Sequence, residues 1–203
     1  MAKLRIGMDL DGVVIDFTRG CYEAMCEMTG TRPPVDFSTL EWDWPKRLFG
    51  EQVYHEFWIQ IAMAQPEFWS ELPSLLNRHE RDQLFRLADA HEVYFITNRP
   101  NGMLEPTVAW LKRELSITFN GTVAFTHGGQ VILSGKKGLI ARGIGLDWMI
   151  DDKPENLMHV VTQSPDTKCM LVHQSWNASS HTSPHMKRVF EFAEILSTLE
   201  RGF

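Results

Sequence analysis

The side chains best suited to chemistry are two acidic pairs, each placed at the end of a run of apolar residues. Asp9 and Asp11 follow the first apolar run and lead into Gly12, while Asp151 and Asp152 follow a run much later in the chain. Neighbouring carboxylates in a partly buried site repel one another unless a cation or a shared proton holds them. The first pair therefore indicates a functional site, although an Asp-Gly turn is the simpler explanation of Asp11.

A third apolar run ends at a hydroxyl and an amide, Thr97 and Asn98, and a lysine, Lys136 or Lys137, precedes the later acidic pair by about one helix. Oxygen ligands with few histidines or cysteines nearby suit Mg²⁺. Beside such a cation, one aspartate can act as a nucleophile and a second as general acid and base. The hydroxyl, the amide and the ammonium can hold phosphoryl oxygens, so the set favours phosphoryl transfer, which depends on positioning and charge neutralisation.

These side chains need a scaffold that gathers several strand ends, and the remaining sequence predicts one. Strands are expected at residues 4–8, 93–96, 122–125, 147–150 and 169–172, and helices at 18–29, 78–90, 105–115, 139–144 and 184–199. Strands that alternate with helices form right-handed crossovers and a parallel sheet, whose ligands bind beyond the carboxyl ends of the strands. We therefore predict an α/β fold with a Rossmann-like, doubly wound parallel sheet.

The first two expected strands are separated by far more residues than one crossover helix needs, so we predict a small helical cap inserted after the first strand. The predicted division is a catalytic core over residues 1–16 and 74–203 and a cap over 17–73. Aromatic residues crowd this insertion, at Phe37, Trp42, Trp44, Phe49, Tyr54, Phe57, Trp58, Phe68 and Trp69. They could form the core of a small helical unit, or a lid whose aromatic side chains face a flat organic group.

Composition disfavours several classes of protein. The 203 residues carry a formal net charge of −6 and no long basic run, which argues against a nucleic acid polymer as partner. No apolar stretch approaches the roughly 20 residues that span a bilayer. The three cysteines form no metal-binding pair, and the chain begins directly with the first strand, leaving no room for a signal peptide. We therefore expect a soluble cytoplasmic protein, and a homodimer is compatible with the sequence.

The ordered motifs resemble those of the haloacid dehalogenase-like (HAD) superfamily of phosphohydrolases. That superfamily has a strand followed by DxDG, a strand ending in Thr or Ser, a lysine, and a strand ending in paired acids. The matching positions are Asp9-Leu10-Asp11-Gly12, Thr97, the lysine and Asp151-Asp152. The resemblance implies a HAD-like core in which Asp9 is the nucleophile that becomes an aspartyl-phosphate. Asp11 would protonate the leaving oxygen and then activate water.

The same resemblance implies the ligands of a Mg²⁺ ion, namely Asp9, the Asp11 backbone carbonyl, Asp152 and, in support, Asp151. It also implies that Thr97 and the lysine bind the phosphate, to which the amide of Asn98 can donate as well. Lys137 is the favoured lysine because Lys-Gly directly opens the expected helix, and Lys136 is the alternative.

Within the superfamily, the sequence is most similar to the 5′(3′)-deoxyribonucleotidases, in segments 9–17, 66–73 and 150–153 and in the place of the insertion. That family is expected to cleave the phosphate of a nucleoside monophosphate with aromatic residues around the base. The candidates for this wall are Phe17, Phe68 and Trp69. A departure occurs after Thr97, where Asn98-Arg99-Pro100 replaces a small pair and leaves substrate choice open. Arg99 could reach the phosphate, cap a helix or pair with a surface acid.

Two other functions are compatible with the sequence. The same chemistry could serve another small phosphate ester, such as a sugar phosphate, or a polynucleotide end, which the acidic balance disfavours. A non-catalytic binding protein on the same scaffold is the further alternative. Such a degenerate copy would be expected to lose one of the motif residues, and all of them are present.

Overall fold

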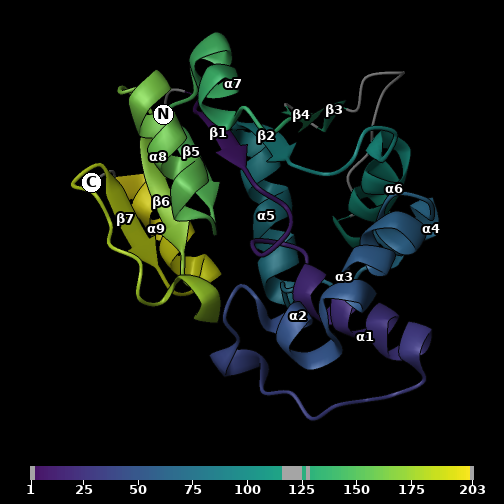
Figure 1. The fold of residues 1–203 in the computed structure, drawn as a ribbon. Coiled ribbons are helices and arrows are strands. Elements are labelled where there is room, and N and C mark those ends of the chain that lie inside the picture. The colour runs from purple at the N-terminus through teal and green to yellow at the C-terminus, as the bar shows by residue number, and fades with distance from the viewer. Residues whose placement is uncertain (1–2, 116–124, 127–128, 202–203) are drawn as a thin grey trace.

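The computed structural model of the protein describes residues 3–115, 125–126 and 129–201, in which one sheet is flanked by helices (Figure 1). Its strands are β1 (Arg5–Met8), β2 (Glu92–Thr97), β3 (Phe125–Thr126), β4 (Gly129–Leu133), β5 (Trp148–Asp151), β6 (Lys168–Val172) and β7 (Met186–Val189). They lie in the order β3-β4-β2-β1-β5-β6-β7. The β3–β4 pair is antiparallel and every other neighbouring pair is parallel. The predicted Rossmann-like α/β class is confirmed.

The central strands are buried on both sides because their side chains alternate between two hydrophobic clusters. Ile6, Met8 and Ile150 belong to one cluster, whereas Met149 and Cys169 belong to the other. Successive residues of a strand point to opposite faces of a sheet, so the clusters mark its two faces. This double burial explains the nearly continuous apolar runs that predict the strands.

Helices cover both faces of the sheet, as a doubly wound fold requires. The first cluster takes side chains from α5 (Arg78–Ala90), α6 (Leu104–Leu115) and α9 (Phe192–Arg201), and the second takes them from α7 (Lys137–Ile144) and α8 (Pro154–Gln163). Figure 1 shows α7 and α8 side by side. Among the helices of the described ranges, none is long and apolar enough to cross a membrane.

A group of helices lies between β1 and α5 in the chain and gathers at one side of the molecule, near α6 (Figure 1). They are α1 (Phe17–Thr29), α2 (Trp44–Phe49), α3 (Glu51–Phe57) and α4 (Pro66–Glu71), with the short turns η1 (Phe37–Thr39) and η2 (Trp58–Ala62), the latter π-helical. The chain enters and leaves this group at adjacent points. The Asp16 N–H donates to the Pro73 carbonyl at 2.8 Å, and the Leu75 N–H donates to the Val14 carbonyl at 2.9 Å.

The predicted helix at residues 184–199 is wrong in its first half. Residues 186–189 form the edge strand β7, parallel to β6, and α9 begins only at Phe192. Met186 and Val189 are buried there, and the backbone gains hydrogen bonds from the otherwise open edge of β6. Tertiary pairing thus outweighs the local helical pattern. Of the predicted strand at 122–125, residues 122–124 lie outside the described residues.

Candidate active site

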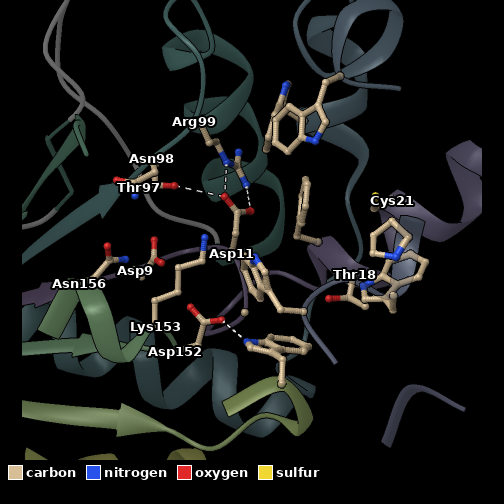
Figure 2. Close-up of a pocket in the computed structure, with 18 of the residues that line it drawn as sticks. Asp9, Asp11, Thr18, Cys21, Thr97, Asn98, Arg99, Asp152, Lys153 and Asn156 are labelled. Carbon is tan, nitrogen blue, oxygen red and sulfur yellow. Dashed lines mark hydrogen bonds and ion pairs between the residues drawn. The ribbon is translucent and has the colours of Figure 1, made fainter. Parts of the chain in front are cut away.

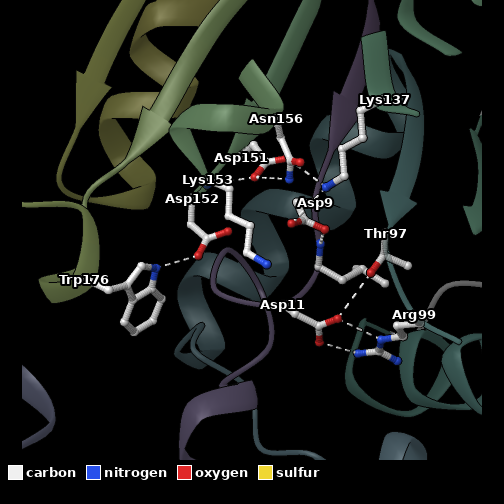
Figure 3. Close-up of polar contacts among 11 residues, drawn as sticks. Asp9, Asp11, Thr97, Arg99, Lys137, Asp151, Asp152, Lys153, Asn156 and Trp176 are labelled. Carbon is white, nitrogen blue, oxygen red and sulfur yellow. Dashed lines mark hydrogen bonds and ion pairs between the residues drawn. The ribbon is translucent and has the colours of Figure 1, made fainter. Parts of the chain in front are cut away.

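The carboxyl ends of β1, β2 and β5 meet at one edge of the sheet. Met8 of β1 lies opposite Ile150 of β5, so the residues that follow, Asp9 and Asp151, end up side by side. Thr97 is the last residue of β2, the strand on the other side of β1. Figure 3 shows the polar side chains of these three strand ends turned toward one another.

Lys137 is a buried cation at this edge. It is the first residue of α7, and its fully buried ammonium lies 2.9 Å from Asp9 Oδ2 and 2.7 Å from Asp151 Oδ2. Burial alone would lower the pKa of Lys137, but the charges of Asp151 and Asp9 outweigh it and raise the pKa above its ordinary value. Lys136, at the N-cap of α7, is exposed. The acidic residues are therefore contacted by Lys137.

Asp9, Asp151 and Asp152 form a compact acidic cluster, in which one oxygen of each carboxylate lies within 4.8 Å of the others. Asp151 accepts hydrogen bonds from Lys137, from the Asn156 amide and from a backbone N–H, so its oxygens are occupied. Asp152 Oδ1 is buried without a hydrogen-bond partner among the described residues. A buried carboxylate oxygen without a partner is costly, and this atom therefore fits the role of a cation ligand.

Burial also perturbs the acidity of the cluster. It raises the pKa of Asp9 to about 7, with Lys137 opposing the shift and the charges of Asp151 and Asp11 adding to it. Burial likewise raises the pKa of Asp152 well above its ordinary value, and the charges of Asp151 and Asp9 add to that shift. A divalent cation beside these oxygens would offset the repulsion and favour the carboxylate forms. The donor set consists of oxygens only, which suits Mg²⁺.

Two neighbours hold Asp152 in place from the turn η3 (Ser175–Asn177), which follows β6. The indole N–H of Trp176 donates to Asp152 Oδ2 at 2.8 Å, and the Asn177 amide donates to the Asp152 carbonyl at 2.7 Å. The first bond leaves Oδ1 as the available oxygen of Asp152. The acidic motifs of the sequence do not predict that Trp176 and Asn177 position Asp152, because the two residues lie 24 and 25 positions after it in the chain.

Asp11 faces away from the acidic cluster. Its Oδ1 accepts from Arg99 Nη2 at 2.7 Å, and its Oδ2 accepts from Arg99 Nε at 3.0 Å and from Thr97 Oγ1 at 3.2 Å. Figure 3 shows this fork-shaped pair beside the Asp9 site. Of the alternatives open to Arg99 from the sequence, pairing with an acid is the one present, although the acid is Asp11 and not a surface residue.

Gly12 gives the loop after β1 its shape. Its φ is +87°, and a Cβ placed there would lie 2.5 Å from Asp152 Oδ2. Glycine is the residue that adopts positive φ without steric cost. The loop then closes on itself, since the Leu10 carbonyl accepts from the N–H groups of Val14 and Ile15 at 2.9 and 2.8 Å. The glycine of the first motif therefore lets the loop after β1 pass directly over Asp152.

A pocket opens over the strand ends and extends to the inserted helices (Figure 2). Figure 2 shows Asp9, Asn98 and Asp152 on one side of it and Thr18 and Cys21 of α1 on the other. The aromatic residues of the insertion that line it are Phe17, Trp42, Trp44, Tyr54, Trp58 and Trp69. The structure thus places a predominantly aromatic wall within one pocket with the candidate nucleophile.

The three aromatic residues predicted to face a base are placed differently. Phe17 and Trp69 line the pocket, but Phe68 is not among the lining residues and packs edge-on against Phe17 and Trp69. One face of Trp69 stacks on Phe17 with ring centroids 5.6 Å apart, and the Arg99 guanidinium lies 4.8 Å from the Trp69 ring centroid. Trp69 is 2% exposed, so little of its ring is open to the pocket.

Trp42, by contrast, is 60% exposed and lines the same pocket. The Lys153 ammonium lies 4.2 Å from its ring centroid, and Trp176 packs against it at 6.2 Å. Trp42 therefore joins Lys153 to Trp176, the residue whose indole N–H holds Asp152.

The fold, with carboxylates at its strand ends, is similar to that of solved haloacid dehalogenase-like (HAD) hydrolases. A HAD-superfamily hydrolase of subfamily IA from Geobacter sulfurreducens superposes with a TM-score of 0.58 at 14% identity, covering 97% of this chain and 96% of that one. A HAD family hydrolase from Deinococcus radiodurans, solved with bound phosphate and sodium, superposes with a TM-score of 0.54 at 12% identity, covering 98% and 96%. At these identities the likeness concerns the fold alone.

Sequence comparison gives the family. The profile described as 5′ nucleotidase, deoxy (Pyrimidine), cytosolic type C protein matches residues 3–199, and the chain belongs to that family. A protein of Oceanobacillus iheyensis with the provisional name of a nucleotidase is 33% identical over 106 residues, which are 52% of this chain and 51% of the relative. The match therefore spans about half the length of that relative. The resemblance inferred from the ordered motifs is confirmed.

Proposed function

We propose that the protein is a Mg²⁺-dependent phosphatase that hydrolyses nucleoside monophosphates, with deoxynucleoside 5′-monophosphates as the preferred substrates. The observation that carries this proposal is the pocket itself. It joins Asp9, a carboxylate beside a buried ammonium, to an aromatic wall that suits a flat nucleobase. Membership of the nucleotidase family supports the same substrate class.

In this proposal Asp9 attacks the phosphorus atom, the bond to the ester oxygen breaks, and an aspartyl-phosphate forms. Asp11 gives its proton to the ester oxygen and later takes a proton from the water that attacks the phosphorus. The phosphoryl oxygens would be held by Thr97, Asn98 and Lys137. The positive charge of Lys137, already fixed between two carboxylates, would neutralise charge that develops during transfer.

A divalent cation, which we propose to be Mg²⁺, would be held by Asp9, Asp152 and the Asp11 backbone carbonyl. The unpartnered Asp152 Oδ1 and the acidity of the cluster support this assignment. Asp151 would act in support, since its oxygens are occupied by Lys137 and Asn156. The ion would supply positive charge to the phosphoryl group, while the protein side chains orient it.

Residues 17–73 would act as the cap that selects the substrate, on a core of residues 1–16 and 74–203. The adjacent entry and exit points of the insertion support this division. Phe17 and Trp69 would contribute to the base wall, with Phe68 packing behind them. The three cysteines are free and buried, as expected in a reducing compartment, and we propose that the protein acts in the cytoplasm.

A screen of phosphate esters tests the proposal. Deoxynucleoside and ribonucleoside 5′- and 3′-monophosphates, sugar phosphates and a phosphorylated oligonucleotide are compared with Mg²⁺ and with EDTA. With Mg²⁺ we expect the highest kcat/KM for deoxynucleoside 5′-monophosphates. With EDTA we expect no turnover of any ester. Faster hydrolysis of a sugar phosphate than of any nucleotide would refute the assignment of nucleotides as substrates. Absence of turnover for every ester in the presence of Mg²⁺ would refute the assignment of phosphatase activity.

A matched pair of variants tests the aromatic wall. Trp42→Leu should raise KM for nucleotides, because the exposed ring lines the pocket. Phe190→Leu removes an equally exposed aromatic ring that is not among the lining residues and should leave KM unchanged. Equal KM values for the two variants would contradict a base-binding wall that includes Trp42.

A further inference from the structure

The most unusual contact of the site is the one between Arg99 and Asp11. The Arg99 side chain is completely buried, whereas that of Asp11 is 21% exposed. Three of the hydrogen bonds described above occupy both Asp11 oxygens, two to Oδ2 and one to Oδ1. Bidentate pairs of this kind fix direction as well as charge, because the guanidinium fork is planar and rigid. The Asp11 carboxylate is therefore held in one orientation.

Arg99 is itself held by two residues outside the polar edge. Its Nη1 donates to Thr107 Oγ1 of α6 at 3.0 Å, and Thr107 is fully buried. Its guanidinium packs over the ring of Trp69 of α4, which also stacks on Phe17. A long side chain loses considerable rotamer freedom when buried, so these contacts give Arg99 a single position from which it can orient Asp11.

We propose that Arg99 is the positioning residue for Asp11, an inference that rests on the proposed phosphatase function. Arg99 does not bind the substrate phosphate. It aims the Asp11 carboxylate, and both oxygens accept hydrogen bonds in the form that Asp11 has after giving up its proton. This is the form that must accept a proton from the attacking water.

The consequence can be separated into two chemical steps with an aryl phosphate. In the first step the bond between Asp9 and phosphorus forms, the bond to the aryl oxygen breaks, and p-nitrophenolate leaves without needing a proton, so that any proton on Asp11 passes to solvent before the second step. In the second step water attacks the phosphorus, the Asp9–phosphorus bond breaks, and the water proton passes to Asp11. A misplaced Asp11 therefore slows only the second step for p-nitrophenyl phosphate. With a nucleotide it slows the first step as well, because the ester oxygen needs a proton.

The test measures rapid-mixing kinetics of p-nitrophenyl phosphate and steady-state kinetics of a deoxynucleoside 5′-monophosphate. For Arg99→Lys, which keeps the charge and loses the fork, we expect a burst of p-nitrophenolate close to one per protein, followed by slow turnover. For the nucleotide, kcat should fall by about 100-fold, the loss typical of a small misplacement of a reacting group, with KM near the wild-type value. Thr107→Val keeps Arg99 but removes one of its hydrogen bonds. It should therefore give a smaller p-nitrophenolate burst and a smaller fall in the nucleotide kcat than Arg99→Lys does.

Arg81→Gln is the matched control, because it breaks a partly buried ion pair, with Glu114, away from the pocket. It should lose stability without a burst. A higher KM and weaker inhibition by inorganic phosphate in Arg99→Lys would show that Arg99 binds phosphate, and absence of a burst would also overturn the inference. Wild-type turnover is measured in the same assay. Its absence would refute the phosphatase function, whereas normal wild-type turnover without a burst in Arg99→Lys would refute only the role of Arg99.

Discussion

Replacement of Trp176 by Phe tests whether the indole N–H prepares Asp152 for a cation. The variant keeps an aromatic ring against Trp42 and removes only the 2.8 Å bond to Asp152 Oδ2. A hydrogen bond to a charged group contributes about 1.5–3 kcal/mol, and 1.4 kcal/mol corresponds to about tenfold in an equilibrium constant. Loss of a residue that orients a metal ligand typically lowers metal affinity by about 10–100-fold. We therefore expect the Mg²⁺ concentration for half-maximal activity to rise by about 10–100-fold.

The assay is a Mg²⁺ titration of phosphatase activity, repeated as a titration of the thermal unfolding midpoint. Trp110→Phe is the matched control, because the Trp110 indole donates to the Leu72 carbonyl at 2.7 Å, outside the pocket. It should reduce stability by about 1 kcal/mol and leave the Mg²⁺ dependence unchanged. Equal half-saturating Mg²⁺ concentrations in Trp176→Phe and in the wild type would refute the reasoning about Asp152.

Two further outcomes follow from the same site. Gly12→Ala should abolish most activity and destabilise the protein, because the new Cβ would lie 2.5 Å from Asp152 Oδ2. Gly102→Ala is the control, since Gly102 has a φ of +90° but faces open space, and it should lower stability without lowering activity. Equal losses of activity in the two variants would contradict a special role of Gly12. The metal-free protein should lose stability from about pH 4 to about pH 7, because the folded state raises the pKa of Asp9 from 3.8 to about 7 and so binds more protons than the unfolded state there. Thermal unfolding should accordingly show a larger stabilisation by Mg²⁺ at pH 8 than at pH 5, and a pH-independent effect would argue against Asp9 as a ligand.

The sheet was predictable because its central strands are buried on both faces and end in short polar motifs. The apolar run before Asp9 and the one before Asp151 carry this signal locally, within a few residues. The sequence of β7 has no such apolar run, because Lys187 lies on its exposed side. This segment forms a strand because it pairs with β6, which the local sequence does not indicate. The helix α8 went unpredicted, although Pro154 begins it and Leu157 and Val160 are its buried residues.

The candidate nucleophile and its charged neighbours were predictable because they follow these strands directly, and the topology of a parallel sheet brings the ends of its strands together. The contacts of Arg99 were not, because its partners come from the loop after β1, from α4 and from α6, and no spacing in the sequence relates them. Trp69 likewise reads as a base-facing ring in the sequence. Only its packing against Phe17 and Arg99 shows that little of the ring is open to the pocket.

The most direct test of the account is the turnover of Asp9→Asn with a deoxynucleoside 5′-monophosphate and Mg²⁺, measured together with thermal unfolding. The amide cannot attack phosphorus as a carboxylate does, and it removes one charge from a cluster whose members repel one another. We expect turnover to be lost while the unfolding midpoint stays at or above that of the metal-free wild type. Wild-type turnover in a folded Asp9→Asn protein would contradict the assignment of Asp9 as the nucleophile.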